Sequence, residues 1–184
     1  MAVLRSKRRR KILLLAVAVL LIVYYLFHIS GYSLSARGAL RHSFPPSDGA
    51  PLYIKSFGDY SVGITGEGKQ QTAKLIYKKW GFLYQVRSSA ALYNPGDKEP
   101  MGITWLAHLA NEREYNVLLA AKVENPAIHI VRFSHEGDLA DSYIEVKVEN
   151  GYAVTYQRLP IAKAGNFVFR GLNDEGKVLA EVKA

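Results

Sequence analysis

The chain contains no cysteine, and this absence excludes disulfide bonds, thiolate nucleophiles and cysteine-based metal sites. It also excludes the acylated cysteine that anchors a bacterial lipoprotein. No Asn-x-Ser/Thr glycosylation acceptor occurs either. Because an exported domain of this size can fold without disulfides, these absences favour a bacterial envelope over a eukaryotic secretory route.

Common catalytic motifs are missing as well. Neither G-x-S-x-G nor S-x-x-K, two patterns of serine catalysis, occurs in the sequence. Gly66-Glu67-Gly68 begins like a dinucleotide-binding loop, but Gln71 takes the place of the third glycine, so we expect an ordinary loop. The sequence therefore predicts no cofactor.

Acidic residues are fewer than basic ones, 16 against 24, which gives a formal net charge of +8. Six of the basic residues lie together in residues 5–11, with no acid among them. The other 18 basic residues nearly balance the 16 acidic ones, so the remainder of the chain is almost neutral. Nucleic-acid binding needs many cations on a folded surface, and we therefore predict no nucleic-acid partner.

One long apolar run is present, ILLLAVAVLLIVYYLFHI over residues 12–29, and it carries no formal charge. As a helix rising ~1.5 Å per residue it would be about 27 Å long, close to the ~30 Å hydrocarbon core of a membrane. Basic residues precede the run, which predicts a cytoplasmic N-terminus and an extracytoplasmic chain after Ser30. We predict a cytoplasmic tail over residues 1–11 and a single-pass transmembrane helix over residues 12–30, with the lipid bilayer as a partner.

A cleaved signal peptide is the alternative, because the small residues Ser33 and Ser35 precede Ala36 in a pattern that resembles a cleavage site. The apolar run is longer than the usual ~7–15 residues of a signal peptide, which favours its retention as an anchor in the cell membrane. Cleavage would instead give a secreted protein. In both cases the remainder of the chain is exported.

Residues 31–51 are predicted to form a juxtamembrane helix and a linker. Ala36, Leu40 and Phe44 recur at helical spacing, and the prolines that follow end the helix. This helix is either a stalk or a part of the folded domain. Residues 52–184 then form one extracytoplasmic domain, because 184 residues are too few for two domains with proper cores.

Short alternating runs between turn signals predict strands through most of this domain. The predicted strands are residues 52–57, 60–65, a strand beginning at 82–86, then 103–110, 115–123, 128–133, 143–149, 152–158, 167–170 and 177–182. A turn is expected at residues 94–97, and Asn150-Gly151 predicts a hairpin. A helix through residues 107–121 is the alternative to the two strands there.

Residues 69–81, KQQTAKLIYKKWG, are predicted to form a second helix. Ala73, Ile76, Tyr77 and Trp80 recur at i, i+3, i+4 and i+7, with polar residues on the opposite side. The predicted fold class is therefore α+β, with one N-terminal transmembrane helix followed by a mainly antiparallel β domain that holds one or two short helices.

This succession of features resembles small membrane-anchored proteins of Gram-positive bacteria. It comprises the membrane helix, a KKWG segment before a strand, an ENPAIHIVRF segment, and β-hairpins that end in NDEGKV. The resemblance spans most of the chain and implies a tethered domain outside the membrane. The group has no established activity, so the resemblance implies none for this chain.

Two groups of side chains are candidates for binding. Lys74 and Lys78 lie on the polar side of the predicted helix and would suit anionic lipid or an anionic wall polymer, although we favour a solvated helix face as their explanation. Tyr143, Tyr152 and Tyr156 lie on the C-terminal strands and would suit another envelope protein, although β-propensity alone also accounts for them.

Histidine is scarce, with five residues spread along the chain. His108, Glu112 and Glu114 form the best local cluster for a metal. His108 and Glu112 would share a face of a helix, but the predicted strand, turn and strand separate them. We therefore predict no metal site and keep His108 and Glu112 only as weak candidates.

Two functions are compatible with these features. The leading prediction is a non-enzymatic interaction or regulatory module tethered to the membrane. The alternative is a membrane-anchored cell-envelope hydrolase with a carboxylate or His-centred site. Its carboxylate candidates, Asp138 with Asp141 and Asp174 with Glu175, lie in turn sequences where Asp usually bonds to the backbone.

Overall fold

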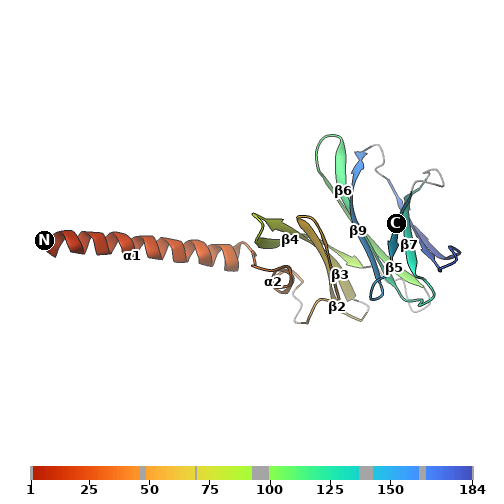
Figure 1. Ribbon diagram of the computed structural model, residues 1–184, viewed down its shortest axis with the longest axis horizontal. Coiled ribbons are helices and arrows are strands. Elements are labelled where there is room, and N and C mark those ends of the chain that lie inside the picture. Colours follow the sequence, from red (N-terminus) through yellow and green to blue (C-terminus); the bar gives the residue numbers. More distant parts are fainter. Residues whose placement is uncertain are drawn as a thin grey trace.

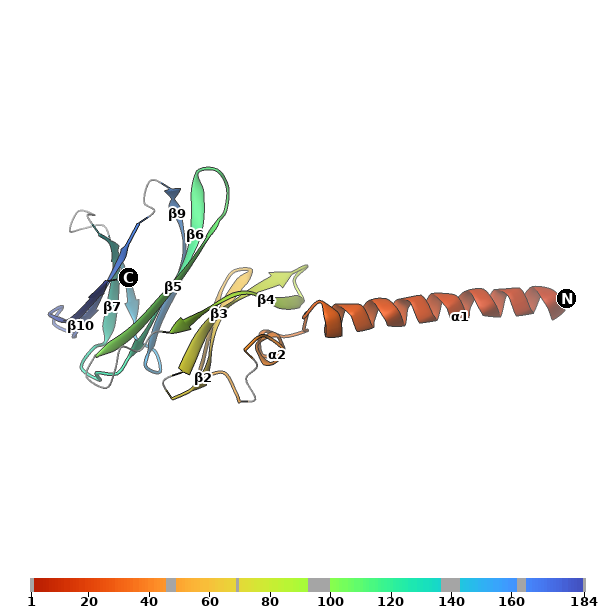
Figure 2. The same ribbon diagram turned by 180° about the vertical axis from the view of Figure 1, so that it is seen from behind.

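The computed structural model describes residues 2–45, 49–68, 70–92, 100–136, 143–161 and 165–183, with side chains from Arg10 onward. Within these ranges the chain forms a long helix, a short helix and eleven strands (Figures 1 and 2). The helical segments are α1 (Ala2–Tyr24), a π-helical turn η1 (Tyr25–Ile29) that continues it, and α2 (Ala36–Arg41). The strands are β1 (Tyr53–Phe57), β2 (Tyr60–Glu67), β3 (Gln70–Lys79), β4 (Leu83–Leu92), β5 (Met101–Leu109), β6 (Glu114–Val123), β7 (Ile130–His135), β8 (Tyr143–Lys147), β9 (Tyr152–Pro160), β10 (Phe167–Leu172) and β11 (Val178–Lys183).

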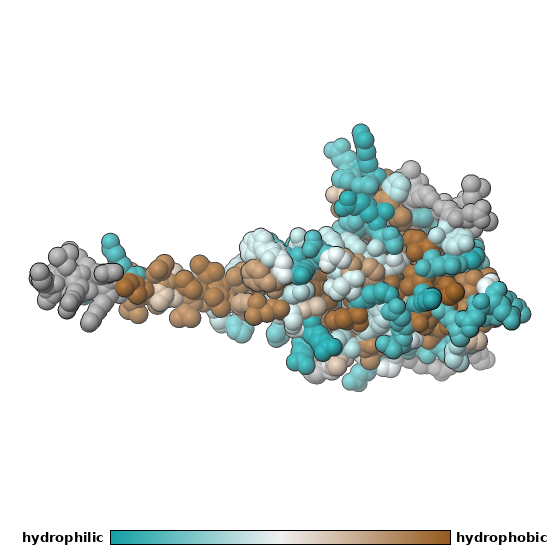
Figure 3. Space-filling model, viewed as in Figure 1, coloured by the Kyte–Doolittle hydropathy of each residue, from teal (hydrophilic) through white to brown (hydrophobic). Residues whose placement is uncertain are grey.

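The long helix carries the predicted apolar segment. Residues Arg10–Ile29 are long and apolar enough to cross a membrane, and none of this segment is buried against the domain. Figure 3 shows apolar surface along most of the helix, whereas the surface of the domain is mixed. The predicted α+β class, with an N-terminal apolar helix before a mainly antiparallel β domain, is confirmed.

Three antiparallel sheets are stacked in the domain (Figure 1). The first sheet has the order β1-β2-β3-β4, the central sheet β5-β6-β9, and the C-terminal sheet β11-β10-β7-β8. One hydrophobic core lies between the first and central sheets, and another lies between the central and C-terminal sheets. Leu118 and Leu119, successive residues of β6, enter different cores, so the central sheet is buried on both faces.

Burial on both faces explains the composition of β6. Every residue from Val117 to Ala121 is apolar and at most 1% exposed, without the alternation of a half-buried strand. The strands predicted at residues 103–110 and 115–123 are confirmed by β5 and β6. The alternative helix through residues 107–121 is wrong.

The short helix α2 packs on the outer face of the first sheet and forms a fourth layer of the domain (Figure 1). Its buried residues Ala39 and Leu40 join Ile76 of β3 in a third apolar cluster. Leu40 lies directly over Gly63 of β2, where an added Cβ atom would be 2.5 Å from Leu40 Cδ1. This helix is therefore part of the folded domain and not a free stalk.

The helix predicted at residues 69–81 is wrong, because residues 70–79 form strand β3. Ala73 and Leu75 of this strand face the core shared with the central sheet. Lys74 and Ile76 face α2 on the other side. Because both faces of β3 are covered, apolar residues do not alternate regularly with polar ones along this strand. Their spacing in the sequence then matches that of an amphipathic helix.

The turn at Asn150-Gly151 forms, but it does not join two strands of one sheet. Both residues have positive φ, 53° and 80°, as a two-residue hairpin turn requires, and Glu149 pairs with Tyr152. Beyond that pair β8 continues along β7, whereas β9 continues along β6. The prediction of a full hairpin is wrong, because each strand completes the hydrophobic face of a different sheet.

The remaining strand predictions agree with the structure. The strands predicted at residues 52–57 and 60–65 form the antiparallel hairpin β1–β2, and those at 167–170 and 177–182 form the antiparallel hairpin β10–β11. Strand β8 lies at an edge of the C-terminal sheet, with Ile144 and Val146 packed against the core and Glu145 exposed, so only one face of this strand is buried. The turn predicted at residues 94–97 lies outside the described residues.

Candidate functional site

A groove of about 450 Å³ lies between the first and central sheets. Strands β4 and β5, the outermost strands of these two sheets at that side, supply much of its wall. It is lined by Tyr60, Leu75, Tyr77, Arg87, Ser88, Leu106, Ala107 and His108. The groove is therefore formed by the stacking of two separate sheets.

Aromatic rings gather along one end of this groove. The ring centroid of Tyr60 is 5.2 Å from that of Tyr77 and 4.7 Å from that of Tyr156. The imidazole of His108 lies 6.2 Å from the Tyr156 ring, nearly parallel to it. Such separations are favourable for aromatic pairs, so the rings hold one another in place.

Hydrogen bonds fix the protonation of His108. Arginine can only donate, so the bond from Arg158 Nε to Asn116 Oδ1 at 3.4 Å orients the Asn116 amide. Asn116 Nδ2 then donates to His108 Nε2 at 3.3 Å, and the Tyr156 hydroxyl lies 3.3 Å from the same nitrogen. Because a nitrogen that accepts a hydrogen bond carries no proton, this arrangement favours a neutral His108 with its proton on Nδ1.

Burial acts on both titratable groups in the same direction, toward the neutral form. Partial desolvation lowers the pKa of His108, although the residue as a whole is exposed. Desolvation also raises the pKa of the Tyr156 hydroxyl, with a smaller contribution from Tyr60. His108 and Tyr156 are therefore both biased toward their neutral forms.

Arg87 brings a positive charge to the groove. Leu75 pairs with Ser88 and Ile76 pairs with Val86, which leaves Arg87 as the extra residue of a β-bulge. Bulges re-aim side chains and are frequent beside functional sites. The guanidinium carbon of Arg87 lies 5.3 Å from the centroid of the Tyr77 ring, a cation–π contact.

The three tyrosines predicted to form a binding face do not share one. Tyr156 belongs to the groove cluster. Tyr152 is buried between sheets, where its hydroxyl donates to Gln71 Oε1 at 3.0 Å. Tyr143 lies on β8 in the C-terminal sheet, with Arg132 stacked 4.0 Å from its ring centroid. Tyr156 instead contacts His108, a lining residue of the groove, and no sequence pattern links these two candidates.

The two candidate lysines occupy different environments. Lys74 is fully buried between β3 and α2, where Nζ donates to Ser43 Oγ at 2.8 Å and to the carbonyl oxygen of Pro45. This burial lowers the pKa of Lys74, and the side chain does not reach an external anion. Lys78 is only half-buried, and its Nζ lies 5.9 Å from the Tyr84 ring centroid.

The predicted cluster around His108 does not converge on a metal position. His108 faces the groove, whereas Glu114 accepts a hydrogen bond from Asn111 Nδ2 at 2.9 Å in the β5–β6 turn that also holds Glu112. Among the described residues, no group of three His, Asp or Glu side chains could hold a metal ion.

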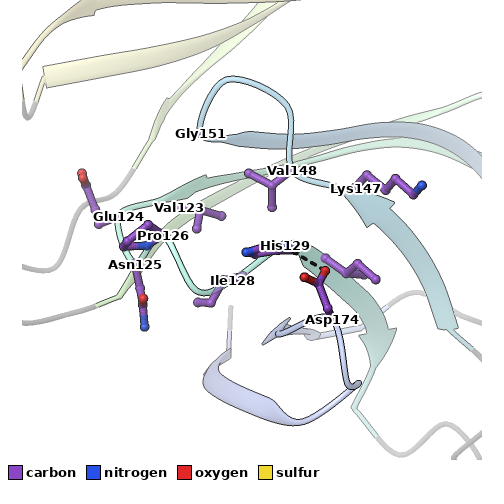
Figure 4. A pocket seen from close by; sticks show the side chains of 11 residues that line it. Val123, Glu124, Asn125, Pro126, Ile128, His129, Lys147, Val148, Gly151 and Asp174 are labelled. Carbon is purple, nitrogen blue, oxygen red and sulfur yellow. Dashed lines mark ion pairs between the residues drawn. The ribbon is translucent and has the colours of Figure 1, made fainter.

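A second hollow, of about 600 Å³, lies where the β6–β7 connection meets the turns after β8 and β10 (Figure 4). There His129 Nδ1 and Asp174 Oδ1 are 2.9 Å apart, and Figure 4 shows the carboxylate directed at the imidazole. None of the described residues that line the hollow carries a hydroxyl or thiol group. Both side chains of the pair are half-exposed or more, where ion pairs are weak.

Tyr60, Tyr77 and Arg87 are groove residues that sequence reasoning missed. A signal for the tyrosines was present, because the short turn after β1 and a strand at residues 70–79 together place Tyr60 opposite Tyr77. The prediction of a helix at residues 69–81 hid this pairing. The bulge at Arg87 depends on how β4 pairs with β3, and it has no sequence signal of its own.

Comparisons of the chain with protein-family models, with curated proteins and with solved structures found no match. The resemblance to small membrane-anchored proteins of Gram-positive bacteria therefore stays a prediction.

Proposed function

We propose that the protein is a membrane-tethered extracytoplasmic binding module of a bacterial envelope, and that its ligand binds in the aromatic groove. The observation that carries this proposal is the meeting of Tyr60, Tyr77, Arg87 and His108 in an open groove, with the Tyr156 ring packed behind Tyr60 and His108. Tyrosine and arginine are the residue types enriched in binding hot spots.

Contacts between the helix and the domain support retention of the anchor. Ser33 and Tyr84 exchange two backbone hydrogen bonds of 2.9 and 2.8 Å, and Gln85 Nε2 donates to the Ser30 carbonyl at 2.7 Å. The Ser35 hydroxyl caps α2 by accepting from the Gly38 amide at 3.1 Å. Cleavage before Ala36 would remove all of these contacts, so a signal peptidase would weaken the domain that it released.

The chemistry of the groove favours a peptide segment of another envelope protein as the ligand. Strands β4 and β5 are edge strands, and away from Tyr84, where Ser33 already pairs with β4, such edges offer backbone groups to which an extended peptide can bond. Tyrosine rings beside such an edge provide pockets for side chains. Arg87 is the sole cation among the described lining residues, which fits an anionic polymer less well.

Photocrosslinking in living cells tests this proposal. A benzoylphenylalanine in place of Ser88 lies in the groove, and one in place of Tyr143 on the C-terminal sheet is the control. We expect a discrete protein adduct from position 88 that position 143 does not give. Tyr77→Ala should reduce that adduct, because loss of a hot-spot tyrosine costs on the order of 2 kcal/mol, or roughly 30-fold in affinity.

Adducts of equal yield from positions 88 and 143, or an adduct insensitive to Tyr77→Ala, would contradict binding in the groove. Tyr143→Ala is the matched control for loss of a tyrosine, because Tyr143 lies outside the groove. Circular dichroism of each purified variant verifies that the domain is folded.

A cell-envelope hydrolase is the second candidate, and one observation favours it. The His129–Asp174 pair in a hollow of about 600 Å³ has the arrangement of a base and the group that orients it. If the hydrolase proposal is correct, Asp174→Asn should abolish cellular function while leaving the position-88 adduct intact. The binding-module proposal predicts the reverse pattern, with function lost in Tyr77→Ala and kept in Asp174→Asn.

A further inference from the structure

The turn between β3 and β4 exposes two large aromatic side chains. Trp80 is 68% exposed and Phe82 is 55% exposed. Both central residues of the turn have positive φ, 52° for Trp80 and 77° for Gly81. Positive φ is uncommon for a bulky residue, so the backbone holds the indole outward at a conformational cost that no burial within the domain offsets.

This turn lies at the end of the domain where the anchor helix enters. Tyr84, two residues after Phe82, forms the backbone bridge with Ser33. Lys79 Nζ lies 5.8 Å from the ring centroid of Tyr32 and 4.6 Å from that of Trp80. Figures 1 and 2 both show the β3–β4 hairpin reaching toward the C-terminal end of the long helix. Aromatic rings, lysine and helix end thus share one region.

The chemistry of this region matches the surface of a bilayer. Tryptophan concentrates at the boundary between hydrocarbon and water, and lysine extends its charge toward phosphate groups. Lys78 and Lys79 precede the exposed rings, and Leu34, which follows the bridging residue Ser33, is a further exposed apolar side chain. A soluble partner would have to approach past the membrane to reach this surface.

We propose that the β3–β4 turn is a second membrane contact, in which Trp80 and Phe82 insert into the outer interface of the bilayer that the anchor helix crosses. Lys78 and Lys79 contact the phosphate headgroups, which carry the opposite charge. This inference rests on the proposed anchoring of the helix. The second contact fixes the orientation of the domain, because a domain attached to the bilayer at two points cannot tilt freely about its anchor helix.

The two tryptophans of the chain allow a direct test, because the anchor helix contains none. The full-length protein is reconstituted into vesicles of three parts phosphatidylcholine to about one part phosphatidylglycerol, with or without bromine on the acyl chains. Trp105→Phe leaves Trp80 as the fluorophore, and Trp80→Phe leaves Trp105, which lies on β5. Bromine quenches indole only at close range.

We expect brominated lipid to reduce Trp80 emission at least about twofold, since interfacial side chains lie ~5–10 Å into the headgroup and acyl boundary. Trp105 emission should be unchanged. Equal quenching of the two tryptophans, or none, would overturn the proposal. If Trp105→Phe does not fold, subtraction of the Trp80→Phe emission from that of the unaltered protein gives the same comparison.

Flotation of the vesicles on a density gradient separates this inference from the anchoring on which it rests. Protein that floats with the vesicles but shows no quenching of Trp80 retains its anchor and contradicts only the second contact. Protein that remains at the bottom of the gradient contradicts the anchoring proposal, and the second contact with it.

Discussion

Lys74 shows how a single charged residue is accommodated inside this fold. Its ammonium group is buried between β3 and α2 and bonds to a serine hydroxyl and a backbone carbonyl. Burial of a charge is costly, and neutral acceptors offset that cost only in part. The aliphatic part of the side chain nevertheless fills space beneath α2. Charge and volume therefore affect stability in opposite directions at this position.

We predict that Lys74→Met leaves the free energy of unfolding within about 1 kcal/mol or raises it, because the volume is kept and the buried charge is removed. Lys74→Ala, which removes both, should lower it by roughly 2–4 kcal/mol through the cavity that it leaves. Denaturant unfolding of the two variants measures the difference. A Met variant as unstable as the Ala variant would mean that the charge itself stabilises the fold.

The lowered pKa of Lys74 also sets a pH dependence. Between its folded pKa and the ordinary value of 10.5 the unfolded chain binds more protons, so stability from this residue rises with pH in that window. Lys74→Met should lose this rise. Subtracting the pH profile of the variant from that of the unaltered protein isolates it, because the buried tyrosines titrate in both proteins.

His108 should respond to pH in the acidic range. Because its folded pKa lies below the ordinary 6.5, the unfolded chain takes up the proton first as pH falls below 6.5. Stability from this residue is therefore present above pH 6.5 and is lost as pH falls through the window toward the folded pKa. His108→Gln keeps a polar side chain without the titration, so the melting temperature of this variant should fall less steeply as the pH drops below 6.5.

At the scale of elements, the sequence was most informative where a strand has one wet face. Ile144 and Val146 alternate with exposed residues, and β8 was predicted correctly. Strand β3 is covered on both sides, so its sequence does not alternate between apolar and polar residues, and its pattern resembles that of a helix. Tyr156 and His108 were recognised as candidates, but their proximity depends on the stacking of two sheets. No local pattern encodes such long-range packing.

The docking of α2 on the first sheet gives a prediction about two elements together. Leu40→Ala should lower the free energy of unfolding by about 2–4 kcal/mol, since Leu40 is buried. Gly63→Ala should cost roughly 1–3 kcal/mol, because the new methyl group would collide with Leu40.

The double variant should cost less than the sum of the two single variants, because the smaller side chain at position 40 makes room for the methyl group. A thermodynamic cycle from denaturant unfolding measures this coupling. Strictly additive effects would contradict the packing of α2 against β2. Gly165→Ala, at a site with no neighbour within 4 Å, is the matched control for adding a methyl group.

At the scale of the whole molecule, the absence of cysteine makes topology directly measurable. Glu175→Cys places a thiol in the exposed β10–β11 turn, and Ser6→Cys places one before the apolar segment. With a cytoplasmic N-terminus, a membrane-impermeant maleimide should label only the Glu175→Cys variant in intact protoplasts. Lysis should then allow labelling at both positions. Labelling at position 6 before lysis would reverse the proposed orientation.

The short connection between helix and domain has a consequence for how the groove meets its ligand. Only six residues separate η1 from α2. The backbone bridge between Ser33 and Tyr84 restricts the movement of this connection further. If the helix anchors the protein as proposed, the groove is held at one height above the lipid while the helix diffuses and rotates. A ligand displayed at that height by another membrane protein is sought in two dimensions rather than three. Modest intrinsic affinity suffices under such confinement, because a high local concentration replaces strong contacts.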